Sequence, residues 1–126
     1  MRIYISGPIA HYDIIERKAR FERAEEAILA SGNIAVNPFE NGVPDDADWR
    51  DHMKADIKML LECDAVYMLE GWEGSKGCKL ELDVATSCGI PVFYYNLCWH
   101  DGKVGSEETN DFTYIRWQDI KMAICI

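Results

Sequence analysis

Four short apolar runs alternate with longer segments of helical spacing, and this alternation most limits the folds open to the chain. The runs are rich in β-branched and aromatic residues, and they predict strands at residues 2–6, 33–37, 64–69 and 91–95. Nearly continuous apolar strands joined through helices indicate a parallel sheet covered on both faces by right-handed crossovers. We therefore expect an α/β fold with a doubly wound, mostly parallel sheet, a flavodoxin-like or Rossmann-like three-layer sandwich.

The segments between these runs have recognisable helix ends. The first helix, amphipathic with its charged residues on one side, should end near Gly32. The second should span roughly residues 48–62, where Asp48 can cap its first turn. The third should run from Ser75 to about Cys88. The resulting order is β-α-β-α-β-α-β.

The rest of the chain, residues 96–126, gives weaker signals. A polar, glycine-containing loop is expected at 100–111 and a short strand at 112–115, followed by a last helix or tail. The length of 126 residues and the hydrophobic content of 48% suit one core. We expect a single domain over residues 1–126.

Charge and cysteine content limit the partners and the compartment. The chain has 13 Lys plus Arg against 22 Asp plus Glu, a formal net charge of -9, so a nucleic-acid polymer is not an expected partner. One small anion can still be held by backbone N–H groups at a helix N-terminus. The five cysteines form no C-x-x-C pair, no run suits a membrane span, and the N-terminal run is too short for a signal peptide. A cytoplasmic protein with reduced thiols is expected.

Two carboxylates fall on helix faces that should be apolar. Counted at about 100° per residue, Glu81 lies in the stripe of the third helix that contains Val84 and Ala85. Asp56 lies in the same way between Met53 and Leu60 of the second helix. An unpaired buried carboxylate costs several kcal/mol or becomes protonated. Each acid therefore needs a buried Arg, Lys or backbone partner, a wet helix end, or a function.

The loops that follow the first and third strands would bring ligands near these acids. In open α/β sheets, ligands bind beyond the carboxyl ends of the strands. The loop after the first strand contains Ser6, Gly7 and Pro8, and the loop after the third contains Ser75 and Gly77. Ser75 is a plausible N-cap beside N–H groups that can receive an anion, and Gly77, one turn before Glu81, leaves room for a ligand. Glu81 and Asp56 are expected to converge there.

Paired carboxylates suit substitution at an acetal carbon, and a sugar–base bond is such an acetal. The three histidines lack metal-ligand spacing, and the chain has no Walker loop, G-x-G-x-x-G or G-x-S-x-G motif. We expect neither a metal nor a cofactor. Trp72, in the loop after the third strand, is a candidate aromatic contact for the base.

Three segments, RIYISGPI, MKADIKMLLECDAVYML and GWEGSKGCKLELDVATSCGIPV, together resemble the nucleoside 2-deoxyribosyltransferase superfamily over residues 1 to about 95. The resemblance is strongest to a small branch close to (deoxy)nucleoside 5′-monophosphate N-glycosidases. It implies that Glu81, in a G-x-x-x-E-x-x-x-A pattern, is the nucleophile that forms a glycosyl-enzyme ester. It also implies that Asp56 manages the proton at the departing base and that Tyr4 orients the glutamate.

The implied function is cleavage of the N-glycosidic bond of a (deoxy)nucleoside 5′-monophosphate or nucleoside by hydrolysis, or exchange of bases as a deoxyribosyltransferase. Position 75 is a serine, as in the relatives that act on 5′-monophosphates. The loop SGPIAH, however, has no arginine where nucleotide-hydrolysing relatives carry one. The resemblance further implies a homodimer or larger homo-oligomer. Two other readings stay open: a non-catalytic nucleotide sensor, and a structural domain in which the acids pair with Arg50 or Arg20.

Overall fold

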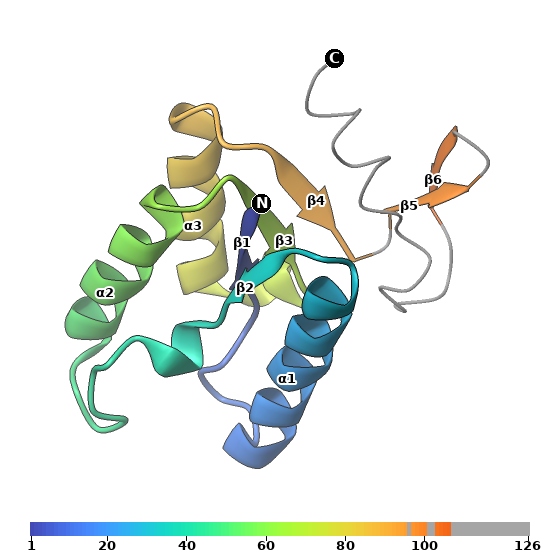
Figure 1. The fold of residues 1–126 in the computed structure, drawn as a ribbon. Helices are drawn as coiled ribbons and strands as arrows, with labels where there is room; N and C mark the ends of the chain where they lie inside the picture. Colours follow the sequence, from blue (N-terminus) through green and yellow to red (C-terminus); the bar gives the residue numbers. More distant parts are fainter. Residues whose placement is uncertain (96, 101–102, 107–126) are drawn as a thin grey trace.

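The computed structural model describes residues 1–95, 97–100 and 103–106. Its core is a four-stranded parallel sheet with helices on both faces (Figure 1). The elements are β1 (Arg2–Ser6), α1 (Ile14–Ala30), β2 (Ile34–Val36), the 3-10 turn η1 (Pro38–Glu40), α2 (Trp49–Leu61), β3 (Ala65–Met68), the 3-10 turn η2 (Trp72–Gly74), α3 (Lys76–Ser87), β4 (Val92–Tyr94), β5 (Leu97–His100) and β6 (Lys103–Ser106).

The strand order in the sheet is β2-β1-β3-β4, and every pairing in it is parallel. Helix α1 covers one face, whereas α2 and α3 lie together on the other (Figure 1). This is the flavodoxin-like order of a doubly wound sheet. The predicted α/β architecture and the strand–helix alternation are confirmed; β1 has its predicted bounds, and β2, β3 and β4 are each two residues shorter than predicted.

Two apolar cores lie on opposite faces of the sheet because successive strand residues point to opposite sides. Ile3 and Ile5 of β1 pack with Phe21 and Ile28 of α1. Tyr4, between the two isoleucines, instead joins the second core. The other buried members of that second core are Val36, Leu60, Cys63, Val66, Met68, Cys78 and Ala85.

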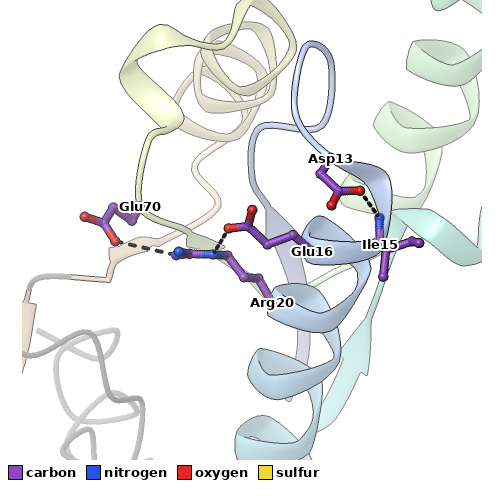
Figure 2. A network of polar contacts seen from close by, with 5 residues as sticks. All are labelled: Asp13, Ile15, Glu16, Arg20 and Glu70. Atoms are coloured by element: carbon purple, nitrogen blue, oxygen red, sulfur yellow. Dashed lines mark hydrogen bonds and ion pairs between the residues drawn. The ribbon is translucent and has the colours of Figure 1, made fainter.

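The helix ends follow local capping rules with one exception. The Asp13 carboxylate accepts a hydrogen bond from the Ile15 N–H at 3.1 Å at the start of α1 (Figure 2), and Gly32 has a φ of +83° beyond its end. The Ser75 hydroxyl accepts from the Cys78 N–H at 3.2 Å and caps α3 as predicted. Asp48 takes the N-cap position of α2, but its side chain makes no capping hydrogen bond, so that predicted contact is wrong.

Three expectations from the sequence need correction. Residues 103–106 form β6, which pairs antiparallel with β5, where a loop was expected over 100–111. The count of about 100° per residue also places Trp49 and Cys88 on the buried stripes of α2 and α3, but both are exposed, because Trp49 is the first residue of its helix and Cys88 follows the last. The strand predicted at 112–115 lies outside the described residues. Among the helices of the described part, none is long and apolar enough to cross a membrane.

Candidate active site

The candidate site lies at the carboxyl edge of the sheet between β1 and β3. Ser6 and Met68, the last residues of these two strands, are paired in the register and end level with each other. From β1 the chain crosses to β2 on one side, and from β3 it crosses to β4 on the other. This is the switch point at which doubly wound sheets bind ligands.

Glu81 is held at this switch point by two hydroxyl groups of β1. The Ser6 hydroxyl donates to Glu81 Oε1 at 2.8 Å, and the Tyr4 hydroxyl donates to Glu81 Oε2. Tyr4 and Ser6 are two residues apart on one strand, so their side chains share a face and meet one helix residue together. Glu81 is 5% exposed. The acid predicted on the apolar face of α3 is buried there with both oxygens fixed.

The protonation of Glu81 reflects a contest between burial and hydrogen bonding. Burial raises the pKa of Glu81 to about 7, the hydroxyls of Tyr4 and Ser6 oppose that rise, and the nearby charge of Asp56 adds to it. Burial, with the charges of Glu81 and Asp56, also raises the pKa of Tyr4 well above its usual value. Tyr4 therefore stays a hydrogen-bond donor at neutral pH.

Asp56 reaches the same region from α2 and is 8% exposed. The Asn41 side-chain amide donates to Asp56 Oδ1 at 2.9 Å and lies 3.2 Å from Nδ1 of His52. The Val43 N–H donates to the Asn41 oxygen at 2.9 Å, which fixes the orientation of the amide. Burial raises the pKa of Asp56, while Asn41 and His52 lower it. A second acid with an elevated pKa thus stands within electrostatic reach of Glu81.

The first turn of α3 approaches α2 closely. A Cβ on Gly77 would stand 3.4 Å from the Met53 sulfur and 3.9 Å from the Ser75 hydroxyl oxygen. Cys78 is buried beside these residues, and burial raises the pKa of its thiol, so it is a thiol rather than a thiolate at neutral pH. Gly77 keeps the contact between the helices free of a side chain one turn before Glu81.

The remaining predicted site residues serve visible packing contacts. A Cβ on Gly7 would lie 2.9 Å from both Leu69 Cδ1 and Phe21 Cζ, so the glycine is required by the core. Pro8 is buried near Gly71. Trp72 packs against Tyr94 with ring centroids 5.5 Å apart. The structure brings Tyr4, Ser6, Glu81 and Asp56 together, and it sets Trp72 against β4.

The arginines considered as buried partners for the acids are engaged elsewhere. Arg20 pairs with Glu16 at 3.3 Å and with Glu70 at 3.7 Å on the outer side of α1 (Figure 2). Arg50 is exposed. Within the described residues, no cation forms an ion pair with Glu81 or Asp56. Hydroxyl and amide groups, rather than salt bridges, hold the two acids.

Three residues near the site had no sequence signal strong enough to single them out. Asn41 follows the 3-10 turn η1, where residue spacing predicts no facing partner, and His52, in the first turn of α2, meets it there. Arg17 is one of several charged residues of α1 that were expected to face solvent, yet it is buried. No group of His, Cys, Asp and Glu in the described part of the chain is arranged to hold a metal ion.

Known proteins with related sequence or structure place this geometry in context. Residues 1–94 match the family described as "Domain of unknown function (DUF4406)". No curated protein matches the sequence. A 2-deoxyribosyltransferase from Bacillus psychrosaccharolyticus superposes with a TM-score of 0.59 at 19% identity, over 75% of this chain and 71% of that one.

Two further solved structures have a similar fold. A 2-deoxyribosyltransferase from Leishmania mexicana has a TM-score of 0.54 at 24% identity and covers 88% of this chain and 75% of that one. A conserved protein from Enterococcus faecalis V583 has a TM-score of 0.57 at 21% identity and covers 96% and 84%. The fold is therefore that of the nucleoside 2-deoxyribosyltransferase superfamily, as the sequence resemblance implied, and the chain belongs to the DUF4406 family.

Proposed function

We propose that this protein cleaves the N-glycosidic bond of a nucleoside or nucleoside 5′-monophosphate through a covalent glycosyl ester of Glu81. The observation that carries the proposal is the arrangement of Glu81, a buried carboxylate whose two oxygens accept hydrogen bonds from Tyr4 and Ser6. No cation pairs with it among the described residues, so a structural ion pair does not explain its burial. Such perturbed acids cluster at functional sites.

In the proposed reaction, an ionised oxygen of Glu81 attacks C1′ of the sugar as the bond from C1′ to the base nitrogen breaks. The electron pair of that bond leaves with the base, and Asp56 supplies the proton directly or through water. Water then attacks C1′ and gives a proton to the Asp56 carboxylate, directly or through a second water, while the ester bond to Glu81 breaks, so both acids return to their starting states. Burial favours the protonated form of Asp56 that a proton donor needs, and the hydrogen bonds from Tyr4 and Ser6 favour the ionised form of Glu81 that attack needs.

Base exchange is the second candidate, and the names of two similar structures favour it. Both the Bacillus and the Leishmania proteins are 2-deoxyribosyltransferases. In this version a second base, instead of water, attacks C1′ of the ester intermediate. Ser75, Gly77 and Trp72 would then contact substrate beside Gly7 and Pro8, because all five belong to the two loops at the carboxyl edge of the sheet.

We also propose that the protein forms a homodimer or larger homo-oligomer and is cytoplasmic. Support comes from apolar side chains left exposed near the start of α1, where Tyr12, Ile14 and Ile15 are 51%, 43% and 76% exposed. The exposed free thiol of Cys88 suits a reducing compartment. Light scattering of the purified protein measures the assembly.

A base-release assay tests the reaction. The four ribonucleosides, the four 2′-deoxynucleosides and their 5′-monophosphates are incubated with the protein, with and without a free acceptor base, and products are separated by chromatography. We expect base release by the wild type and at least a 10³-fold loss with Glu81→Gln. The control Glu73→Gln removes an exposed acid near the same loop and should retain activity. New nucleosides formed only with acceptor identify a transferase.

No turnover by the wild type on any member of the panel would contradict the proposal. If nucleotides then still raised the melting temperature, the site would be that of a nucleotide sensor. Equal base release by wild type and Glu81→Gln would leave the fold assignment intact but remove Glu81 from the chemistry.

A further inference from the structure

Arg17 is a buried arginine with unsatisfied hydrogen-bond donors. It is 3% exposed, and its Nε and Nη2 atoms have no hydrogen-bond partner within the described part of the chain. Its guanidinium carbon lies 5.3 Å from the ring centroid of Tyr12 and 5.7 Å from that of Phe21. A guanidinium does not lose its proton in proteins, so burial leaves a charge with donors that lack an acceptor. A buried residue of this kind indicates a missing anionic partner.

The position of Arg17 places that missing partner near Glu81. Arg17 lies in the second turn of α1, which begins at the carboxyl edge of the sheet after the loop that follows Ser6. Phe21, under the guanidinium, lies 2.9 Å from where a Cβ on Gly7 would stand, and Gly7 directly follows Ser6. The hydroxyl of Ser6 binds Glu81.

Arg17 also lies near the first turn of α3, close enough for Cys78 to influence its pKa. Burial lowers the pKa of Arg17 and the charge of Arg20 adds to this, while Tyr12, Glu16 and Cys78 act against it. Cys78 belongs to the first turn of α3, three residues before Glu81. Arg17 is thus within electrostatic reach of the α3 N-terminus, whose N–H groups and dipole also favour an anion.

The neighbouring acids are bound to other groups and do not accept hydrogen bonds from Nε and Nη2 of Arg17. Glu16 pairs with Arg20, which also reaches Glu70, and Figure 2 shows this network along the outer side of α1. Glu81 is bound by Tyr4 and Ser6. The planar donor set of Arg17 matches the oxygens of a phosphate group, which accepts paired hydrogen bonds.

We propose that Arg17 binds the 5′-phosphate of a nucleoside 5′-monophosphate whose C1′ is presented to Glu81. This inference rests on the proposed function and narrows its substrate from nucleosides and nucleotides to nucleotides. The loop SGPIAH lacks an arginine, and α1 supplies the guanidinium from a different point of the chain. Arg17 is then a specificity-determining residue, because only the phosphorylated substrate satisfies its donors.

The test compares Arg17→Met with the control Arg20→Met. Both changes remove a guanidinium from α1, but the Arg20 side chain is partly exposed and already pairs with Glu16 and Glu70. The measured quantity is kcat/KM for a 5′-monophosphate divided by kcat/KM for the matching nucleoside. We expect Arg17→Met to lower this ratio by about 10- to 100-fold, the loss of charge-assisted hydrogen bonds, and Arg20→Met to leave it within about twofold.

A binding measurement tests the inference even if no turnover is detected or if Arg17→Met folds poorly. In the Glu81→Gln protein, the 5′-monophosphates should raise the melting temperature and the matching nucleosides should do so less, with inorganic phosphate competing for the same site. Arg17→Lys keeps the charge and should restore part of the ratio lost in Arg17→Met.

Two results would overturn the inference. One is an unchanged ratio in Arg17→Met with Glu81-dependent base release intact, which would retain the proposed function and remove the phosphate from Arg17. The other is equal thermal stabilisation of Glu81→Gln by nucleoside and monophosphate. Loss of all base release in the wild type contradicts the proposed function instead, so the two failures are distinguishable.

Discussion

At the scale of single residues, the proposed chemistry depends on the pKa of Glu81, which burial raises and hydrogen bonds lower. Burial favours its neutral form, whereas the hydroxyls of Tyr4 and Ser6 favour the carboxylate that attack requires. A count of 100° per residue was enough to predict that Glu81 and Asp56 face inward, because both lie within regular helices. The same count cannot find Asn41, which reaches Asp56 from an irregular turn, or Arg17, whose burial depends on contacts with Tyr12 outside its helix.

The pH dependence of activity should follow the ionisation of Glu81. Since its pKa is raised to about 7, kcat/KM should rise with pH through that region. Tyr4→Phe removes one of the two hydrogen bonds that oppose the rise, so the ascending part of the profile should move to higher pH and kcat should fall about 10- to 100-fold. Profiles of wild type and variant on one substrate check this, and an unshifted ascending limb in Tyr4→Phe would count against Tyr4 as the orienting group.

Stability should also depend on the ionisation of Glu81, in the direction opposite to that of an acid whose pKa is lowered on folding. The folded-state pKa of about 7 exceeds the unfolded value of 4.5, so the folded state binds the extra proton between these values. The contribution of Glu81 to the free energy of unfolding is therefore full below pH 4.5. It falls by roughly 3 kcal/mol as pH rises from there through about 7.

Glu81→Gln removes this dependence, so its stability advantage over wild type should grow from pH 5 to pH 8. Urea unfolding of both proteins across that range measures the difference. A constant difference between the two proteins would show that the carboxyl group titrates normally in the folded state. Asp56 is present in both, so its own titration largely cancels from the comparison.

At the scale of secondary-structure elements, the two loops at the carboxyl edge serve different purposes. The loop after β1 is fixed by the core, because Gly7 has no room for a side chain between Leu69 and Phe21. The start of α3 has more space, because a Cβ on Gly77 would meet only Met53 and Ser75 at ordinary contact distances.

A matched pair of alanine substitutions separates these purposes. Gly7→Ala should lower the free energy of unfolding by about 1–3 kcal/mol through overpacking. Gly77→Ala should leave it unchanged or raise it by up to about 1 kcal/mol, since alanine favours helix, but it should raise KM if ligand approaches Glu81 there. Chemical unfolding and steady-state kinetics of both variants measure the two effects. Equal effects on stability and none on KM would assign Gly77 to packing as well.

Most elements were predictable from sequence for a specific reason. The strands β1 and β3 are nearly continuous apolar runs because both are central in the sheet and are buried on both faces. Helix ends were found where a cap or a glycine marks them, as at Ser75 and Gly32. Strand β6 was missed because its sequence, KVGS, is short, polar and contains glycine.

At the scale of the whole molecule, a doubly wound sheet places residues from distant parts of the sequence at one edge. Tyr4 and Glu81 are 77 positions apart and hydrogen-bonded, and Asp56 joins them from α2. The fold is shared with 2-deoxyribosyltransferases, while the proposed substrate preference depends on a single side chain of α1, Arg17. Fold and specificity thus have separate origins in the sequence.

The stereochemistry of sugar transfer tests the central claim, a covalent ester at Glu81, most directly. A substrate from the base-release panel is cleaved in buffer containing methanol, and the methyl glycoside is identified by NMR, because it does not change configuration after release. Two displacements at C1′ predict the β-methyl glycoside, with the configuration of the starting nucleotide retained. The α-methyl glycoside would mean a single displacement by solvent and would contradict a glycosyl–Glu81 intermediate.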